Sequence, residues 1–180
     1  WYDEATCVPF LLRYPAIKGS EGRRITMPIN TPDIMPTLLG LCNIPIPYTV
    51  EGNNFSEIIT GKEKERDYSA LIVSPTKNVA GIEFRGVRTS RYSYVKDLKG
   101  SIYLFDNIKD PYQMNNLVNK PSDDSIQNDM EKRLSTALRL ADDDFLPEYK
   151  YLDKFGIFLT PGGYPPFEDN YPSLSASANK

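Results

Sequence analysis

Apolar residues near the start of the chain form one short, continuous run. It reads VPFLL at residues 8–12 and is closed by Arg13, Tyr14 and Pro15. Such a run, bounded by prolines, is typical of a strand buried on both faces. Pro9 and Pro15 have no N–H to donate to a central ladder, so we expect this strand to be short.

A helical pattern follows the predicted strand. Ile34, Leu38 and Leu41 fall on one face at helical spacing, and Thr31 can cap the helix that they define. Pro36 removes a backbone hydrogen bond inside this helix, so we expect a kink or a late start. A short helix beside a buried strand indicates an α/β layer.

The pattern changes at residues 62–67, where KEKERD mixes both charge signs and indicates a solvated face. The residues that follow are rich in β-branched and aromatic side chains, which predicts strands at 70–74, 81–97 and 101–106. The LKG turn between the last two predicts an antiparallel hairpin. Gly86 interrupts the long strand, so we expect a bulge there.

An amphipathic helix comes after the strands. Ser122 can cap it, and a sheet of a few strands needs such a cover. Asp142, Asp143 and Asp144 lie beyond its end, where we interpret them as a solvated acidic cluster. From Leu146 onward proline, glycine, tyrosine and serine dominate, which predicts an extended tail that frays after about residue 173. The apolar positions of the helix are Ile126, Met130, Leu134, Ala137, Leu138 and Ala141.

These elements divide the chain into three parts. Residues 1–61 are the edge of an α/β domain, and their segment 52–61 is a loop with a short helical turn. Residues 62–145 are a small α+β subdomain, an antiparallel sheet covered by one amphipathic helix. Residues 146–180 are the tail. The predicted fold class is therefore α/β followed by α+β.

Composition and charge exclude several classes of function. The chain has 180 residues, a net charge of −3 and 40% hydrophobic residues, which are ordinary globular proportions. Its 21 basic residues are scattered, so we expect no nucleic-acid partner. Apolar runs are strand-sized, so we expect no membrane span. The histidine count is zero, which excludes Ser-His-Asp catalysis and imidazole zinc sites within this sequence.

The two cysteines, Cys7 and Cys42, form no CxxC pair. We interpret both as buried small hydrophobic residues rather than nucleophiles, and their spacing leaves open whether they form a disulfide. The compartment cannot be derived from them.

Three arginines are the most suggestive polar set. Guanidinium groups bind sulfate, phosphate and carboxylate through a bidentate fork, and Arg85, Arg88 and Arg91 lie close together in sequence. Strand alternation places Arg88 on the face opposite Arg85 and Arg91. Structural ion pairing with the abundant acids is the favoured interpretation. Asp106 and Asp110 flank a turn, where we expect them to cap backbone N–H groups.

Five segments, in order, resemble the type I sulfatases. WYDEATCVPFLLRYPAI is similar to their YEE-x-x-x-VP segment, and NTPDIMPTLLGLCNIPIP to their D-hydrophobic-x-PT stretch. VEGNNFSEIITG, RGVRTSRYSYV and YLFDNIKDPYQMNNL are similar to three further family signatures. The resemblance covers about residues 1 to 145. The family has the alkaline phosphatase-like fold, which implies that residues 1–61 are the end of its α/β sandwich.

The resemblance also implies a chemistry. The family hydrolyses sulfate esters with a formylglycine made from Cys or Ser in a C-x-[PA]-S-R motif, and it holds a divalent cation, usually calcium. Cys7 is followed by VPF and does not match that motif. We therefore expect no catalytic and no metal-binding residues in this chain. Its expected role is to complete the sulfatase fold and to form one wall of the substrate cleft. Arg88 and Arg91 are candidate substrate-binding residues for an acidic sulfated sugar.

Several alternatives stay open. The same region occurs at the end of phosphonate and phosphate monoester hydrolases, and a free-standing carbohydrate-binding or interaction module is a third reading. The implied partners are an upstream sulfatase catalytic region and a sulfated small molecule or carbohydrate. We expect the chain to be inactive alone. An exported location, periplasmic, secreted or lysosomal, is implied by the family only.

Overall fold

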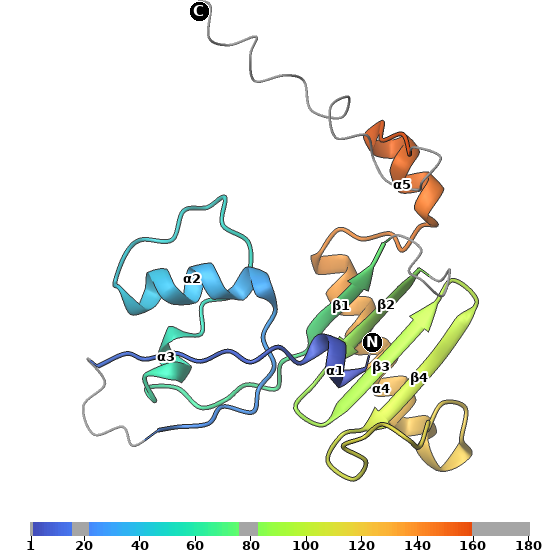
Figure 1. Ribbon diagram of the computed structural model, residues 1–180, viewed down its shortest axis with the longest axis horizontal. Coiled ribbons are helices and arrows are strands. Elements are labelled where there is room, and N and C mark those ends of the chain that lie inside the picture. The colour runs from blue at the N-terminus through green and yellow to red at the C-terminus, as the bar shows by residue number, and fades with distance from the viewer. Residues whose placement is uncertain (1, 16–21, 76–82, 160–180) are drawn as a thin grey trace, which may run out of the picture.

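The computed structural model describes residues 2–15, 22–75 and 83–159. Figure 1 shows α2 and α3 together on one side, and a four-stranded sheet with α4 on the other. The helices are α1 (Asp3–Thr6), α2 (Thr31–Leu41), α3 (Ser56–Ile59), a 3-10 turn (Pro121–Asp123), α4 (Asp124–Leu140) and α5 (Glu148–Phe155). The strands are β1 (Ala70–Ser74), β2 (Phe84–Arg88), β3 (Tyr92–Asp97) and β4 (Gly100–Asp106).

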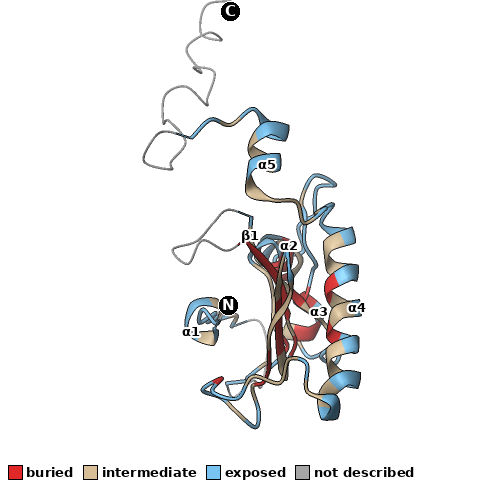
Figure 2. Cartoon of the chain, turned by 90° about the vertical axis from the view of Figure 1, so that its right-hand side faces the viewer, coloured by how far each residue is buried: buried red, intermediate tan, exposed pale blue. Residues whose placement is uncertain are grey.

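The sheet is an antiparallel meander in the order β1-β2-β3-β4. Its register places Val87, Tyr94 and Leu104 side by side on one face. Met130 and Leu134 of α4 close this buried core, and Figure 2 shows α4 running along that face. The predicted hairpin and its covering helix are confirmed, because a meander buries an apolar face only when another element covers it.

The single long strand predicted at 81–97 is wrong. Its described part is divided into β2 and β3 by a turn that Thr89 closes. The Thr89 N–H donates to the carbonyl of Tyr92 at 2.9 Å, and the Thr89 Oγ1 accepts from the Tyr92 N–H at 2.8 Å. Gly86 pairs in regular register with Val95, and the register shift lies after Val95 instead. The threonine can satisfy both backbone groups locally, which favours a turn over a continued strand.

The buried strand predicted at 8–12 is also wrong for the described chain. This segment is extended but not a strand, and the exposed fractions of Val8 and Leu11 are 78% and 93%. An extended segment becomes a strand only beside a partner, and the described residues place none next to it.

Helix α2 begins at Thr31 and Asn30 is its N-cap, so the capping role predicted for Thr31 is wrong by one residue. Its first turn is fixed by Asp33, whose Oδ2 accepts from the Asn30 N–H at 2.7 Å. The helix continues past Pro36, so the late start is wrong. Pro36 is fully buried, and that burial offsets the one missing backbone bond.

A second, smaller core lies between α3 and the segment that precedes α2. It contains Met27, Phe55 and Ile58, and Tyr68 packs against it. The short helical turn expected within 52–61 is confirmed as α3. The domain boundary at residue 61 stays a prediction.

The extended tail expected from Leu146 is wrong over its first part, because residues 148–155 form α5. The helix ends at Gly156, which has a φ of 63°. This left-handed conformation favours glycine, which explains why the helix ends there. The expected fraying after residue 173 lies outside the described residues.

The expectation that both cysteines are buried is wrong. Cys7 follows the single turn of α1, and Cys42 is the C-cap of α2; both are free and exposed. Both cysteines lie at the end of a helix, where no neighbouring element of the described chain covers their side chains.

Candidate functional site

Arg85 and Arg88 lie on opposite faces of the sheet, as strand alternation predicts, whereas Arg91 lies in the turn between β2 and β3. Arg85 lies on the face of the sheet that α4 covers. Arg88 lies on the opposite face, which we call the open face. Each guanidinium pairs with an aspartate, Asp143 for Arg85 and Asp3 for Arg88. The predicted structural ion pairing is confirmed for both.

The Arg88–Asp3 pair joins residues 85 positions apart. Its geometry is bidentate: Nε lies 3.1 Å from Oδ1, and Nη2 lies 3.0 Å from Oδ2. The side chains are 20% and 24% exposed, so water has limited access to both. This pair holds α1 against the open face, on the opposite side of the sheet from α4 (Figure 2).

Arg91 and Asp106 form another bidentate pair, at the end of β4. Arg91 Nη2 lies 2.7 Å and Nε 3.1 Å from Asp106 Oδ2. Hydrogen bonding from Arg91 lowers the pKa of the Asp106 carboxyl. Oδ1 of Asp106 also accepts from the Ile108 and Lys109 N–H groups at 3.3 Å, so the predicted capping role is confirmed. The Arg91 side chain remains 42% exposed, more than the other two arginines.

Gln113 was missed by the sequence analysis, although it is the centre of the network on the open face. It is 4% exposed, and its Oε1 accepts from the Asp3 N–H at 2.8 Å. Its Nε2 donates to Asn107 Oδ1 at 2.7 Å, and Asn107 Nδ2 donates to Ser93 Oγ at 2.9 Å. These bonds connect the segment after residue 2 with β3 and the turn after β4. Only tertiary contacts reveal this role, because the partners are far apart in sequence.

Aromatic contacts complete the same junction. The ring of Tyr2 lies 5.7 Å from that of Tyr103 and 5.9 Å from that of Phe105, between centroids. The Tyr103 and Phe105 rings stack on each other at 5.5 Å. The first described residues are therefore held to the sheet by apolar, polar and charged contacts together.

Asp33 organises a second polar centre, beside α2. It is 1% exposed, and its Oδ1 accepts from the Asn53 N–H at 2.7 Å. The Tyr68 hydroxyl donates to Oδ2 at 3.1 Å. Burial, followed by the charge of Asp33, raises the pKa of Tyr68 to about 12. Thr37, one helical turn on, bonds the same loop through Phe55 N at 3.0 Å. The aspartate and threonine of the PDIMPT stretch thus have a structural role.

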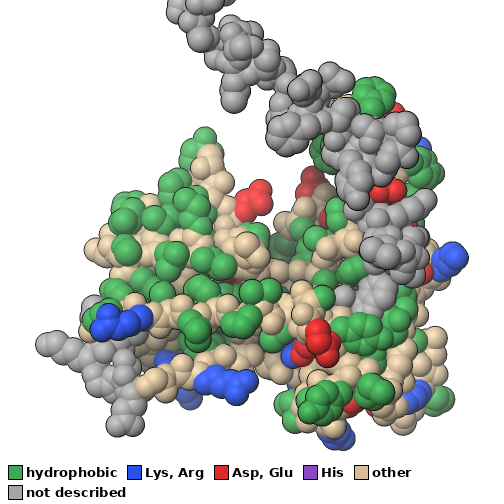
Figure 3. Space-filling model, in the orientation of Figure 1, with side chains coloured by type: hydrophobic (Ala, Val, Ile, Leu, Met, Phe, Trp, Pro, Cys, Tyr) green, Lys and Arg blue, Asp and Glu red, His purple; other side chains and the backbone are tan. Residues whose placement is uncertain are grey.

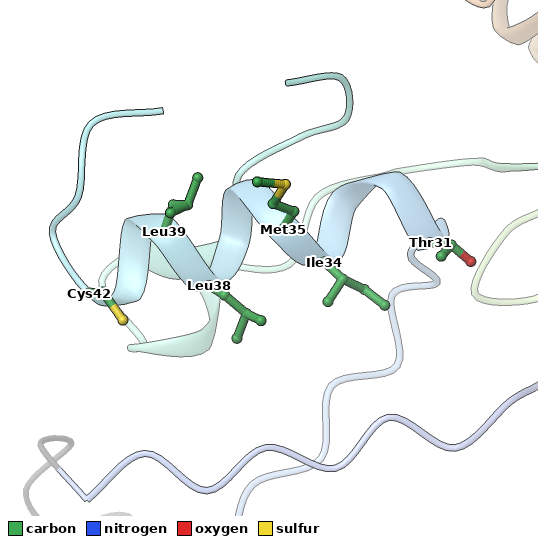
Figure 4. Close-up of a pocket in the computed structure, with 6 residues that line it drawn as sticks. All are labelled: Thr31, Ile34, Met35, Leu38, Leu39 and Cys42. Atoms are coloured by element: carbon green, nitrogen blue, oxygen red, sulfur yellow. The ribbon is translucent and has the colours of Figure 1, made fainter. Parts of the chain in front are cut away.

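An apolar surface covers the outer side of α2. Figure 3 shows hydrophobic side chains gathered over this helix, and Figure 4 shows the hollow that they line. Met35 and Leu38 are 56% and 40% exposed. The hollow is lined by Thr31, Ile34, Met35, Leu38, Leu39 and Cys42.

No group of three or more acidic or cysteine side chains is placed to hold a metal ion within residues 2–15, 22–75 and 83–159. The acidic side chains of the described residues therefore do not form the cluster of carboxylates that a calcium ion needs. No helix among them is long and apolar enough to span a membrane.

A family model and curated relatives identify the family of this chain. The profile described as "N-sulphoglucosamine sulphohydrolase, C-terminal" matches residues 1–139. The chain is 40% identical over 157 residues to an ulvan-active sulfatase of Formosa agariphila, covering 86% of this chain and 31% of that protein. It is 34% identical over 169 residues to an endo-4-O-sulfatase of Bacteroides thetaiotaomicron, covering 82% of this chain and 32% of that protein.

A solved structure shares the fold. A Bacteroides thetaiotaomicron protein assigned to the sulfatases superposes with a TM-score of 0.55 and 26% identity, over 67% of this chain and 26% of that one. The chain spans about a third of the length of the curated relatives that it matches.

Proposed function

This chain belongs to the sulfatases, as a member of the N-sulphoglucosamine sulphohydrolase C-terminal family, and on that premise we propose that it serves a sulfuric-ester hydrolase that acts on a sulfated carbohydrate. The observation that carries the proposal is the family match over residues 1–139. Both curated relatives described above are sulfatases by name, which favours a sulfate ester over a phosphonate or phosphate monoester.

The reactive groups of such an enzyme belong outside this chain. The family implies a formylglycine residue, which would supply the nucleophile, and a calcium ion, which would supply the charge that polarises the sulfate. The residues of this chain build one wall of the cleft. Arg88 and Arg91 are the proposed substrate-binding residues, because a guanidinium fork fits a sulfate or a carboxylate. Arg91 is the stronger candidate, since its side chain is the more exposed.

The proposed partner of this chain is the upstream sulfatase catalytic region. Residues 8–12 are extended and apolar, and both ends of their segment are held. The Asp3 carboxylate accepts from Arg88 in β2, and the Tyr14 hydroxyl donates to the Leu41 carbonyl at 2.6 Å. An extended segment with fixed ends is preorganised to receive a neighbouring strand. The adjoining apolar face of α2 gives the same partner a surface to bury.

Sulfatase activity on a chromogenic aryl sulfate, measured with calcium, tests the proposal. We expect no turnover by the 180 residues alone and turnover when the upstream coding region is restored. Turnover by the 180 residues alone would contradict the assignment of the reactive groups. Inactivity of both forms, with turnover of an aryl phosphonate by the extended one, would favour the alternative ester.

The partner surface has its own test. Leu11→Asp puts a charge on the exposed segment, so we expect less aggregation of the 180 residues and loss of activity in the extended enzyme. Ile108→Asp is the matched control, because Ile108 is 68% exposed in the turn after β4 and lies outside the segment 8–12. If the unsubstituted 180-residue chain is itself soluble and monomeric, that result would instead favour a free-standing binding module.

Substrate binding by the arginines is tested in the extended enzyme. Arg91→Ala is expected to raise KM for a sulfated oligosaccharide by about tenfold while kcat changes little, because it removes one charged contact made in ground and transition states alike. Arg88→Ala is measured in parallel. Arg66→Ala is the control, since Arg66 pairs with Glu63 on the surface. An unchanged KM in both variants would remove the two arginines from the site.

A further inference from the structure

Arg85 is the most completely buried charged side chain of the sheet. Its exposed fraction is 1%, although a guanidinium is costly to remove from water. Nη1 donates to the carbonyls of Ser74 and Phe84, each at 3.0 Å. Nε and Nη2 donate to the two carboxylate oxygens of Asp143, the second at 3.3 Å. The β2 strand therefore presents a buried cation whose carboxylate partner comes from beyond α4.

Two aromatic rings complete the cage around this guanidinium. The centroid of Phe145 lies 5.0 Å from its central carbon, and that of Tyr151 lies 5.8 Å away. The Tyr151 hydroxyl also donates to Asp143 and accepts from the Leu146 N–H, the latter at 3.1 Å. Because Tyr151 lies in α5, the cage connects α5 directly to β2.

The segment between α4 and the end of α5 is folded around the same carboxylate. Asp143 Oδ1 accepts from the Phe145 N–H at 2.8 Å, and Phe145 has a φ of 52°, rare for an aromatic residue. The Glu148 N–H donates to Glu83 Oε1 at 3.2 Å. A strained backbone persists only where its surroundings hold it, which here are the contacts with Arg85.

We propose that Arg85 is a positioning residue that anchors residues 142–157 on the sheet as a clasp. The clasp lies outside residues 1–139, which the family profile matches, whereas Arg85 lies within them. A buried guanidinium requires a paired carboxylate, so β2 holds Asp143 in place, and the segment that carries Asp143 orders α5. The smallest cooperative unit of the C-terminal subdomain then extends to residue 157, beyond the boundary at 145 that sequence pattern suggests.

If the clasp exists, substitutions should affect the stability of the sheet and the anchoring of α5 separately. Asp143→Asn leaves the buried guanidinium without its charge partner, so both the sheet and α5 lose stability. Arg85→Met removes the cation together with its contacts to Asp143 and the two rings, so α5 is released while the sheet keeps an apolar side chain of similar length. In the double variant the sheet should regain what Asp143→Asn loses, but α5 should stay released.

Hydrogen exchange of the full chain separates these effects. Amides of residues 149–156 are expected to exchange at least about tenfold faster in Arg85→Met and in the double variant, with unchanged exchange in β3 and β4. The unfolding equilibrium constant is expected to rise about a hundredfold in Asp143→Asn and to recover most of that change in the double variant. Arg85→Met carries the test alone if Asp143→Asn does not fold.

Asp67→Asn is the matched control. Asp67 also pairs with an arginine across the chain, Arg133, but its side chain is 73% exposed. We expect no change in α5 exchange and a small change in stability. Unchanged exchange of α5 in Arg85→Met, or a double variant no more stable than Asp143→Asn, would overturn the proposal.

Discussion

The side-chain amide of Asn30 pairs with both backbone groups of Leu71. Nδ2 donates to the Leu71 carbonyl at 2.7 Å, and Oδ1 accepts from the Leu71 N–H at 2.8 Å. Leu71 lies in β1, at the edge of the sheet, so the amide takes the place of a neighbouring strand. Because Asn30 is also the N-cap of α2, one residue joins that helix to the sheet.

An asparagine closes the other edge in the same way. Asn116 Oδ1 accepts from the Leu104 N–H at 3.0 Å, and its Nδ2 donates to the Ile102 carbonyl at 2.8 Å. Each asparagine thus satisfies two backbone groups of an outer strand of the meander. Amide side chains suit this task because each offers a donor and an acceptor in one plane.

Replacing Asn30 should weaken the connection between α2 and the sheet. Asn30→Ala removes two hydrogen bonds and leaves the Leu71 groups unsatisfied, so we expect a loss of about 2 kcal/mol in the free energy of unfolding. Urea denaturation measures it. Asn128→Ala is the control, because Asn128 is exposed on α4 and should change stability by less than about 0.5 kcal/mol. Equal effects of the two variants would contradict this role for Asn30.

Asp33 should be one of the costliest side chains to remove near α2. Asp33→Ala leaves the N–H groups of Asn30 and Asn53 and the Tyr68 hydroxyl without their acceptor. Bonds to a buried charged group are strong, so we expect a loss of about 3 kcal/mol in a denaturant titration. The pKa of Tyr68 should fall from about 12 toward its ordinary value as the neighbouring negative charge disappears. A Tyr68 titration unchanged by the substitution would contradict the electrostatic part.

Gly86 is required by close approach rather than by its dihedral angles. A Cβ built there would lie 2.5 Å from the Tyr94 carbonyl oxygen and 2.9 Å from Val95 Cγ2. The Tyr94 oxygen is backbone in the sheet and cannot move aside cheaply, so Gly86→Ala should destabilise the fold by about 1–3 kcal/mol. Gly22→Ala is the control, because a Cβ at Gly22 meets nothing within 4 Å. Thermal melting of the two variants should differ by several degrees.

The free energy of unfolding should be independent of pH near neutrality and should decrease at acidic pH. Hydrogen bonds from arginine lower the pKa values of Asp67 and Asp106 in the folded chain. A carboxyl with a lowered folded pKa contributes stability above its unfolded value of about 3.9, and this contribution is lost as pH falls through the folded pKa. The chain has no histidine, so no side chain with an ordinary pKa between 5 and 8 titrates.

Unfolding free energies measured from pH 3 to pH 8 test this expectation. We expect a plateau above about pH 5 and a decline below about pH 4. Asp106→Asn should reduce the steepness of that decline. An unfolding free energy that changes between pH 6 and pH 8 would contradict the prediction.

Local signals were sufficient where neighbours in sequence are also neighbours in space. The β3–β4 hairpin is joined by a tight turn, and α4 has a clear apolar stripe, so pattern alone predicted both. Residues 70–74 were predicted as a strand and form β1. Ion pairing of Arg85 and Arg88 followed from composition, but the identity of their aspartate partners did not.

Local signals failed where a distant partner decides the outcome. VPFLL has the pattern of a buried strand, yet the described chain places no strand beside it, so it lies exposed. The aspartates at 142–144 look like a solvated cluster, yet Asp143 is drawn to a buried guanidinium 58 residues away. Gln113 carried no signal at all, because its partners belong to three separate segments.

The sequence by itself determined the family, the strand–helix order of the subdomain and the absence of histidine chemistry. These properties depend on residue types and their spacing, which a chain carries whether or not it is folded. Tertiary structure decided which residues form the junction around Asp3 and Gln113, where Asn30 closes the sheet and how Arg85 holds the clasp. Each of these requires atoms from segments tens of residues apart to meet at hydrogen-bonding distance, and only the folded chain fixes such distances.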